Sequence, residues 1–407
     1  MRSTVGNVGS NSARPQSGFR RRIGIGAFVS AAILAASAQT ALAGAEFKLS
    51  DDATLNLGLG LRTSFTSLER GAANGSSSSN DFSAESTRIY MSGTFGKYVK
   101  ATMNFDRQGG ASATATAQMI DGIAQFELSE GFNVWMGRML PPSDRANLAG
   151  PYYTSAWAYP GIASNGPSIA AGRDDGGMIW GNLLESKLAY SVGLFNGHNR
   201  GNNGATPPVL NSNSSNKLMS AARVQYSFWD AETGYYRNST YLGGKDLLTI
   251  GGSIQSQDNG TGTSASPGTL KISNLDFLLE KKLDSGMVPT LEGGYYVYSL
   301  QKRDSGSGTN AGGLEGGKSK LITAALLFPQ QVGWGKFQPF VRYQKFDRTA
   351  MSAAPNTTNS GTDYGINYLI KGFNAKVSAV YSKLEDTSSA AALQKRDQFV
   401  LGVQLQY

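Results

Sequence analysis

The sequence predicts an all-β protein, a 16-stranded antiparallel β-barrel that crosses a membrane. Three observations predict this fold: apolar and polar residues alternate along most of the chain, long connections alternate with short ones, and the chain ends in an amphipathic strand with a terminal aromatic residue. The composition agrees, because only 16% of the 407 residues are charged while 51 are glycine. The mean hydropathy of −0.27 excludes a bundle of membrane helices, which needs repeated apolar stretches of about 20 residues.

The N-terminal residues 1–43 have the three parts of a secretory signal. Three arginines at 20–22 precede an apolar run over 23–36, and an Ala-Leu-Ala site at 41–43 follows. We expect the signal to be removed, leaving 44–407 as the barrel. The alternative, a membrane anchor, is disfavoured because the apolar run is too short to span comfortably. Removal takes away five arginines and no acidic residue, so the net charge falls from +8 to +3. A charge of +3 no longer favours a nucleic-acid partner.

The first strand predicted after the signal shows the alternation clearly. The segment 54–65 reads TLNLGLGLRTSF, with leucine at 55, 57, 59 and 61 on one face and polar or small residues on the other. The same period of two recurs at about 88–95, 99–106, 222–228 and 274–280. Each of these segments therefore predicts a β-strand with one apolar and one polar face.

Long and short connections alternate between the predicted strands. Seven short ones lie near 96–97, 129–131, 184–186, 229–246, 284–287, 329–336 and 371–373. Eight longer ones, rich in Gly, Ser, Asn and Thr, span about 66–82, 107–118, 140–175, 197–216, 257–268, 299–317, 348–361 and 385–395. With both chain ends on the side of the short connections, this pattern requires 16 antiparallel strands, the layout of an outer-membrane barrel.

Aromatic residues and the last strand support a membrane location. Aromatic side chains stand beside most short connections, namely Phe95, Tyr98, Phe126, Phe132, Phe228, Trp229, Phe328, Trp334 and Phe337. This position is typical of the aromatic girdle of a barrel. The chain ends in FVLGVQLQY, whose aromatic and aliphatic residues at 399, 401, 403, 405 and 407 share one face. Such an ending resembles the recognition strand of bacterial outer-membrane proteins, and it predicts the outer membrane as the location.

Several short motifs resemble one family of channels. The segment GRMLPPSDR at 137–145, followed by GPYY at 150–153, is similar to the loop entry of phosphate-selective porins of the O/P type. So are FDR at 105–107 and FWD…GYY at 228–236. The resemblance implies a homotrimer of 16-stranded barrels in which the long third loop, here 140–175, folds inward and narrows the pore. Two departures are the absence of lysine from this loop and the short lead of 44–53 before the first strand.

Arginines are the candidate anion-binding residues of the pore. The polar parity of the strands points Arg62, Arg88, Arg223 and Arg342 inward, and Arg138, Arg145 and Arg173 lie in or beside the 140–175 loop. A guanidinium stays charged and presents several donors in one plane, so a series of them can pass an anion along a channel. The alternative is that they pair with acids of the same parity, namely Glu127, Asp276, Glu280, Glu292 and Asp363.

Aromatic side chains in the same loop leave two interpretations open. Tyr152, Tyr153, Trp157 and Tyr159 either line the constriction or pack the loop against the inner wall. The acidic pair at 174–175 either binds a cation or forms a solvated turn, and we expect the second. We therefore predict no metal site and no cofactor.

The combined interpretation is an outer-membrane porin, a water-filled channel for passive diffusion of small hydrophilic solutes that prefers phosphate or other small anions. The alternative is a non-transporting structural or binding barrel, such as an adhesin or the sheath of a complex. We predict no enzyme and no catalytic residue, because the chain has no cysteine, a single histidine and no serine with a plausible basic partner. The expected partners are outer-membrane lipid and small anionic or polar solutes.

Overall fold

The structure is a computed structural model that describes residues 44–108, 116–164, 172–198, 212–213, 215–302, 315–349 and 356–407. The expected signal segment, 1–43, lies outside the described residues, as do parts of several expected long connections. Signal cleavage therefore stays a prediction. Within the described ranges, no helix is long and apolar enough to cross a membrane.

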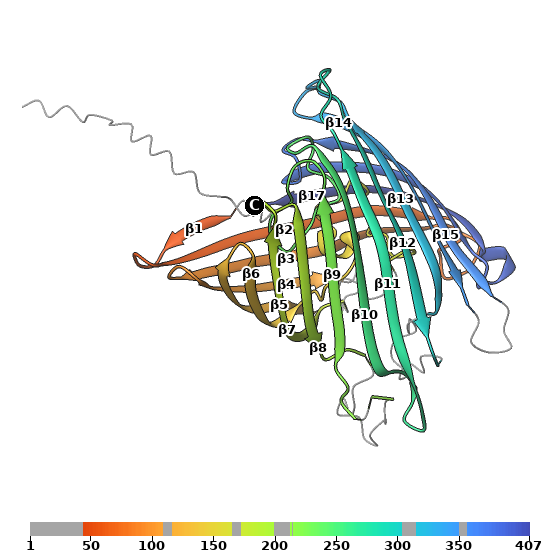
Figure 1. The fold of residues 1–407 in the computed structure, drawn as a ribbon. Coiled ribbons are helices and arrows are strands. Elements are labelled where there is room, and N and C mark those ends of the chain that lie inside the picture. The colour runs from red at the N-terminus through yellow and green to blue at the C-terminus, as the bar shows by residue number, and fades with distance from the viewer. Residues whose placement is uncertain are drawn as a thin grey trace, which may run out of the picture. The chain divides into compact units, whose positions relative to one another are not determined.

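Sixteen strands of the described chain form one closed antiparallel ring (Figure 1). They are β2 (Ala53–Leu68), β3 (Ser79–Phe95), β4 (Val99–Gln108), β5 (Ala117–Ser129), β6 (Phe132–Met139), β7 (Asp174–Leu183), β8 (Leu188–Phe195), β9 (Met219–Ser227), β10 (Leu247–Thr263), β11 (Ser266–Glu280), β12 (Val288–Leu300), β13 (Gly317–Leu327), β14 (Lys336–Arg348), β15 (Thr357–Leu369), β16 (Ala375–Asp386) and β17 (Lys395–Gln406). Each strand pairs with the next, and β17 pairs back onto β2, with Leu401 opposite Phe65. Closure satisfies the backbone groups that an open edge would expose to lipid. The predicted 16-stranded barrel is confirmed.

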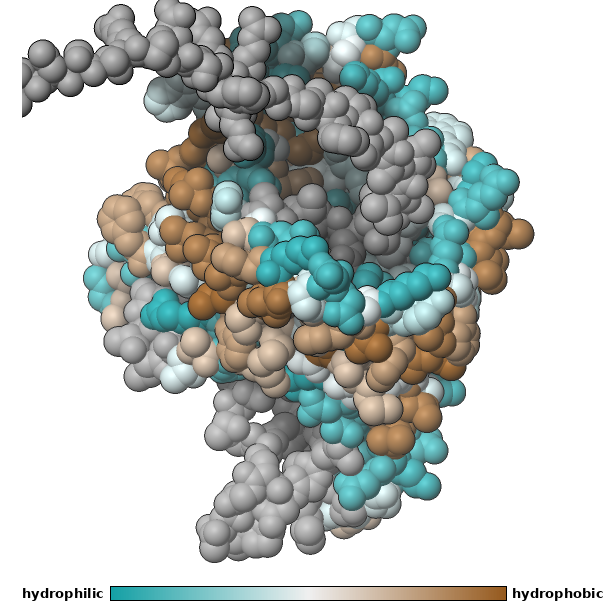
Figure 2. Space-filling view, turned by 90° about the vertical axis from the view of Figure 1, so that its left-hand side faces the viewer, coloured by the Kyte–Doolittle hydropathy of each residue, from teal (hydrophilic) through white to brown (hydrophobic). Residues whose placement is uncertain are grey.

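Side chains alternate between the outside and the inside of the ring. In β2, Leu59 is 54% exposed whereas Arg62 is 2% exposed. In β17, Phe399 and Leu401 are exposed whereas Gln404 is buried. Figure 2 shows apolar side chains, in brown, gathered on the outer surface seen from that side, interspersed with polar ones in teal. The apolar parity therefore faces outward, where a barrel meets lipid.

One rim of the ring, which we call the terminal rim, carries the C-terminus and β1 (Ala45–Lys48). The sequence did not predict β1, which pairs with the 54–57 end of β2. Strand β17 ends short of that segment, since the backbone of Tyr407 bonds to Leu59. β1 therefore covers the part of β2 that β17 does not reach.

The prediction of a long connection at 257–268 is wrong. β10 continues to Thr263 and β11 begins at Ser266, so only two residues separate the strands. The segment contains glycine and polar residues on both faces, which suggested a loop. The hairpin nevertheless continues, with Thr261 opposite Gly268 after an irregularity. Backbone pairing does not depend on an apolar face once a strand extends into water.

The prediction of a short turn at 229–246 is also wrong, because this connection is long. The connection between β9 and β10 spans 228–246, and we call it the inward turn. It leaves the terminal rim and enters the ring, where Glu232, Thr240 and Tyr235 are buried. Buried polar side chains need partners, and the interior of the ring supplies them, as described below.

The connection between β6 and β7, residues 140–173, is the inserted loop, and it contains the short helix α1 (Arg145–Ala149). Its described residues, 140–164 and 172–173, lie within the ring, where Figure 1 shows them in yellow. Side chains of β2, β9, β10 and each strand from β12 to β17 donate hydrogen bonds to its described carbonyl groups. Contacts from so many strands place this loop across the lumen.

The assignment of the lipid-facing side chains can be tested by introducing an arginine at one of two exposed positions, in separate variants. Ile322 lies at the middle of β13 and is 44% exposed, whereas Val332, in the 328–335 connection of the terminal rim, is 50% exposed. We expect Ile322→Arg to lower the free energy of unfolding by about 2–4 kcal/mol and Val332→Arg by about 0–1 kcal/mol, because the cost depends on membrane depth. Urea titration of the barrel in lipid vesicles measures both. Equal effects would contradict the assignment of the lipid face.

Candidate functional site: a lumen crossed by two inward segments

Donors from the barrel wall hold the inserted loop through its backbone. Lys376 donates to the carbonyl of Thr154 at 3.2 Å, and Asn367 donates to that of Ser155 at 2.7 Å. The guanidinium of Arg62 donates to the carbonyls of Pro151 and Trp157. A loop inside a barrel has few backbone partners of its own, so wall side chains must satisfy its carbonyl groups. Arg62 is thus an anchor of the loop.

The loop aromatics lie against the wall at positions where the strands carry glycine. Trp157 packs on Gly402, where an added Cβ would lie 2.5 Å from the indole ring. Tyr152 packs on Gly60, where an added Cβ would lie 2.9 Å from the hydroxyl oxygen of the tyrosine. Arg62 lies over the Trp157 ring with its central carbon 4.1 Å from the centroid, a cation–π contact. The absence of a side chain at the two glycines gives the loop room to approach.

The two other predicted constriction aromatics are half-buried. Tyr153 lies edge-on to Phe373, with ring centroids 5.3 Å apart. The hydroxyl of Tyr159 is 2.7 Å from that of Ser164 within the loop. The loop aromatics therefore pack against the wall and the loop, and each also borders one of two cavities described below.

Arg145, in α1, joins the inserted loop to the inward turn. Its guanidinium donates to both carboxylate oxygens of Glu232, at 2.5 and 2.8 Å, and to the carbonyl of Asn238 at 2.8 Å. Gln225 of β9 and Thr249 of β10 accept from the same group at 3.1 and 2.7 Å. The side chains of Arg145 and Glu232 are 1% and 0% exposed. In this buried ion pair, which we call the Arg145–Glu232 tie, the two charges neutralise each other and hold the loop to the turn.

Two wall acids fix the inward turn on its other side. Glu280 accepts from the hydroxyl of Thr240 and from the backbone N–H of Gly243 at 2.8 Å. Glu292 accepts from the hydroxyl of Ser239 at 2.8 Å. The backbone N–H of Ser239 also donates to the carbonyl of Tyr153 at 3.0 Å, so the turn touches the loop directly. The two segments form one continuous bridge across the lumen.

The remaining candidate arginines stand in ion pairs with acids of the wall. Their nitrogen–oxygen distances are 2.7 Å for Arg88–Asp106, 2.7 Å for Arg173–Asp121, 2.6 Å for Arg223–Asp276, 2.7 Å for Arg342–Asp363 and 3.5 Å for Arg138–Asp175. Glu127 pairs with Lys100. Of the five acids expected as partners, Asp276 and Asp363 pair with arginines, whereas Glu280 and Glu292 accept hydrogen bonds from hydroxyl groups of the inward turn. Whether any of the arginines also binds a passing anion stays a prediction.

Sequence reasoning missed the residues of the inward turn. Glu232, Arg237 and Asn238 are buried inside the ring, although their segment was expected to be an ordinary connection. Its length and its dense mixture of aromatic and charged residues were the available signal. A solvated turn on a barrel rim has no need of such a composition.

Two cavities lie beside the bridge. One, of about 390 Å³, is bordered by β2–β7, the inserted loop and the inward turn, and includes Arg88, Asp121 and Arg237. The other, of about 230 Å³, is bordered by β14–β17 and the loop, and includes Arg342 and Asp363. Within the described residues, no group of three or more His, Cys, Asp or Glu side chains could hold a metal ion.

Comparison with known proteins supports the architecture and the expected resemblance. Residues 309–407 match the family model described as phosphate-selective porin O and P. The last quarter of the chain resembles these porins. The resemblance predicted from the sequence is thus confirmed over these residues. No curated protein matches the chain.

Solved structures of outer-membrane porins share the fold. An anion-selective porin from Comamonas acidovorans aligns with a TM-score of 0.57 at 11% identity, over 88% of this chain and all of its own. OmpF of Salmonella typhi, solved with daunomycin, aligns at 0.56 and 10%, over 89% of this chain and all of its own. The channel DcaP of Acinetobacter baumannii aligns at 0.55 and 10%, with the same coverage. The fold is that of a porin, and with the family match it indicates the bacterial outer membrane.

The Arg145–Glu232 tie can be measured by a double-mutant cycle. Breaking a buried pair leaves one charge without its partner and costs about 3–5 kcal/mol. We expect Arg145→Met and Glu232→Gln each to destabilise the barrel, and the double variant to be more stable than the sum of the two effects predicts. Urea unfolding in vesicles gives the coupling. The control cycle uses the exposed pair Lys48–Asp51, where we expect no coupling. Additive effects at Arg145 and Glu232 would contradict the tie.

The same tie predicts a pH dependence. Burial alone would raise the pKa of Glu232, but the charge and hydrogen bonds of Arg145 lower it from 4.5 to about 2. Because the pKa is lower in the folded state, the stabilisation is complete above about pH 4.5 and is lost as the pH falls towards 2. The stability difference between the native chain and Glu232→Gln should therefore shrink over this range. Burial raises the pKa of Asp144 to about 6, but Asp144 titrates in both chains and cancels in the difference. A constant difference would contradict the predicted pKa.

Proposed function

We propose that the protein is a passive outer-membrane channel for small hydrophilic solutes and that it prefers anions. The observation that carries the proposal is the contrast between the two sides of the ring. Outside, apolar side chains face the lipid, whereas inside, charged and amide side chains surround two cavities. Sixteen strands enclose a lumen too wide for wall side chains to fill, so the inward segments determine its free width. No catalytic step enters this proposal.

The anion preference is supported by a lumen cation, Arg237, that has no acidic partner among the described residues. Arg237 forms no ion pair with any described residue, and its Nη1 donates to the carbonyls of Gly234 and Tyr236. Phosphate and other small anions are the solutes that the family match and the Comamonas porin's description suggest.

Export and assembly complete the proposal. The signal composition of 1–43 supports cleavage before Gly44. A homotrimer is supported by the porin fold, since a Vibrio cholerae outer-membrane protein with the same fold was solved in a trimer form, at a TM-score of 0.52 and 11% identity. The bridge across the lumen favours a second candidate function, a binding or structural barrel that does not conduct. A conductance measurement distinguishes this function from a channel.

Planar bilayers test the proposal directly. Under a KCl gradient we expect open channels whose reversal potential has the sign produced when chloride is more permeant than potassium. Arg237→Gln should move that potential towards zero, because it removes a lumen charge with which no described acid forms an ion pair. Lys371→Gln removes the same charge from an exposed position of the terminal rim and should leave the potential unchanged. A cation-selective potential would overturn the anion preference, and no conductance would overturn the channel.

A further inference from the structure

The larger cavity has two chemically different walls. Side chains of β2–β5, among them Asn56, Ser92 and Thr102, form a polar wall within a few residues of the terminal rim. Another part of the lining is aromatic and consists of Trp135 of β6, Trp180 of β7, and Tyr235 and Tyr236 of the inward turn. The volume of about 390 Å³ falls in the range of about 300–1,000 Å³ typical of small-molecule sites.

The aromatic wall is one connected cluster of rings. Trp135 lies 5.3 Å from both Trp180 and Tyr235, and 5.9 Å from Tyr236, between ring centroids. Tyr235 and Tyr236 are 5.2 Å apart and meet edge to face. The cluster fastens the inward turn to β6 and β7, so these rings do not depend on a solute for their position. A flat apolar solute meets here a preformed surface of the kind that aromatic rings favour.

One cation on this cavity has no ion-pair partner among the described residues. Arg88 and Arg173 are paired with Asp106 and Asp121, and Glu127 is paired with Lys100. Arg237 differs, because its partners are backbone carbonyls. Its Nη2 makes no hydrogen bond to any residue of the described chain, although Nη1 makes two, at 2.6 and 3.0 Å.

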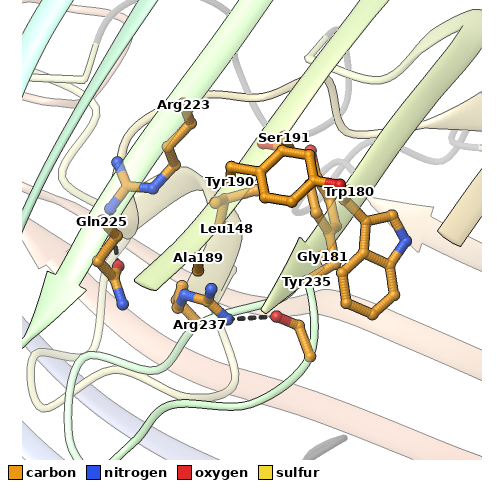
Figure 3. A pocket seen from close by; sticks show the side chains of 11 residues that line it. Leu148, Trp180, Gly181, Ala189, Tyr190, Ser191, Arg223, Gln225, Tyr235 and Arg237 are labelled. Atoms are coloured by element: carbon orange, nitrogen blue, oxygen red, sulfur yellow. Dashed lines mark hydrogen bonds between the residues drawn. The ribbon is translucent and has the colours of Figure 1, made fainter. Parts of the chain in front are cut away.

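Figure 3 shows how the inward turn presents this guanidinium. Arg237 borders a neighbouring pocket of about 10 Å³ that Tyr235, Trp180 and Leu148 also line, and it donates a hydrogen bond to the carbonyl of Gly234. Arg237 borders both this pocket and the larger cavity. A turn held by Glu232 and Glu280 cannot withdraw easily, so the charge stays close to the aromatic rings.

We propose that the cavity binds a small organic anion with a flat ring, the class of aromatic carboxylates, as it passes through the channel. The carboxylate takes the charge-assisted hydrogen bonds that Arg237 offers, and the ring lies against the aromatic wall. The polar wall solvates the remaining edge of the solute. An inorganic anion uses only the first of these contacts, and a neutral ring uses only the second. The inference rests on the proposed channel function, for which it names a solute class.

Block of the open-channel current separates the contributions of charge and ring. Benzoate carries both, acetate carries only the charge, benzamide carries only the ring, and inorganic phosphate is a larger charge without a ring. We expect benzoate to halve the KCl current at a concentration at least about tenfold below that of each of the other three. Equal block by benzoate and acetate would overturn the aromatic class, although conductance in KCl would still support the channel.

Variants connect the block to the cavity. Arg237→Gln should raise the half-blocking concentration of benzoate about tenfold or more, whereas Arg237→Lys, which keeps the charge, should recover part of the loss. Trp180→Leu should weaken benzoate without changing acetate, and Lys371→Gln should change neither. Unaltered benzoate block in both Arg237→Gln and Trp180→Leu would overturn this site.

Calorimetry on the detergent-solubilised barrel provides a measurement that does not depend on conductance. Benzoate should bind the native chain, and Arg237→Gln should lose that binding while keeping the native circular dichroism spectrum. If the barrel binds benzoate but does not conduct, the site stands and the channel function fails. If it conducts but does not bind benzoate, the channel stands and the site fails.

Discussion

The interior of the barrel depends on one buried guanidinium. Arg145 belongs to a helix of only five residues, which has little stability of its own. It joins the inserted loop to the inward turn through Glu232 and to the wall through Gln225 and Thr249. A ring of 16 strands leaves a lumen that its own side chains do not fill. The loop and the turn occupy part of it and leave two cavities beside them. They hold each other in place because each supplies the charge that pairs with the other's buried charge.

The barrel itself could be predicted from the sequence because a lipid-facing ring follows simple rules. A period of two separates Leu59 from Arg62, and the alternation of connection lengths gives the number of strands. These rules fail where lipid no longer acts on the chain. The β10–β11 hairpin extends to Thr263 with polar residues on both faces. Strand β1 pairs with the start of β2, which lies open because the last strand ends at Tyr407, opposite Leu59.

The residue types that face the lumen could be predicted from the sequence, but their hydrogen-bond and ion-pair partners could not. Parity correctly directed Arg62, Arg88 and Arg342 inward, yet no sequence pattern gives the loop carbonyls that Arg62 meets or the register that brings Asp363 to Arg342. Ionised groups in a buried interior need partners, so most of the arginines are anchors and ion pairs. The inward turn escaped prediction because its position depends on Glu280 and Arg145, which are distant in sequence. Arg237, which has no ion-pair partner among the described residues, is the arginine on which the proposed solute preference depends.

The contact between the two inward segments is the most direct test of this account. The chain contains no cysteine, so a pair introduced as Tyr153→Cys and Ser239→Cys is the only pair that can react. A backbone hydrogen bond of 3.0 Å joins these two positions, which places them near the reach of a disulfide. Oxidation followed by mass spectrometry should show an intramolecular bond in the folded barrel, and Tyr153→Cys with Gln331→Cys on the terminal rim should form none. Failure of the 153–239 pair to cross-link in the folded barrel would show that the loop and the turn do not meet.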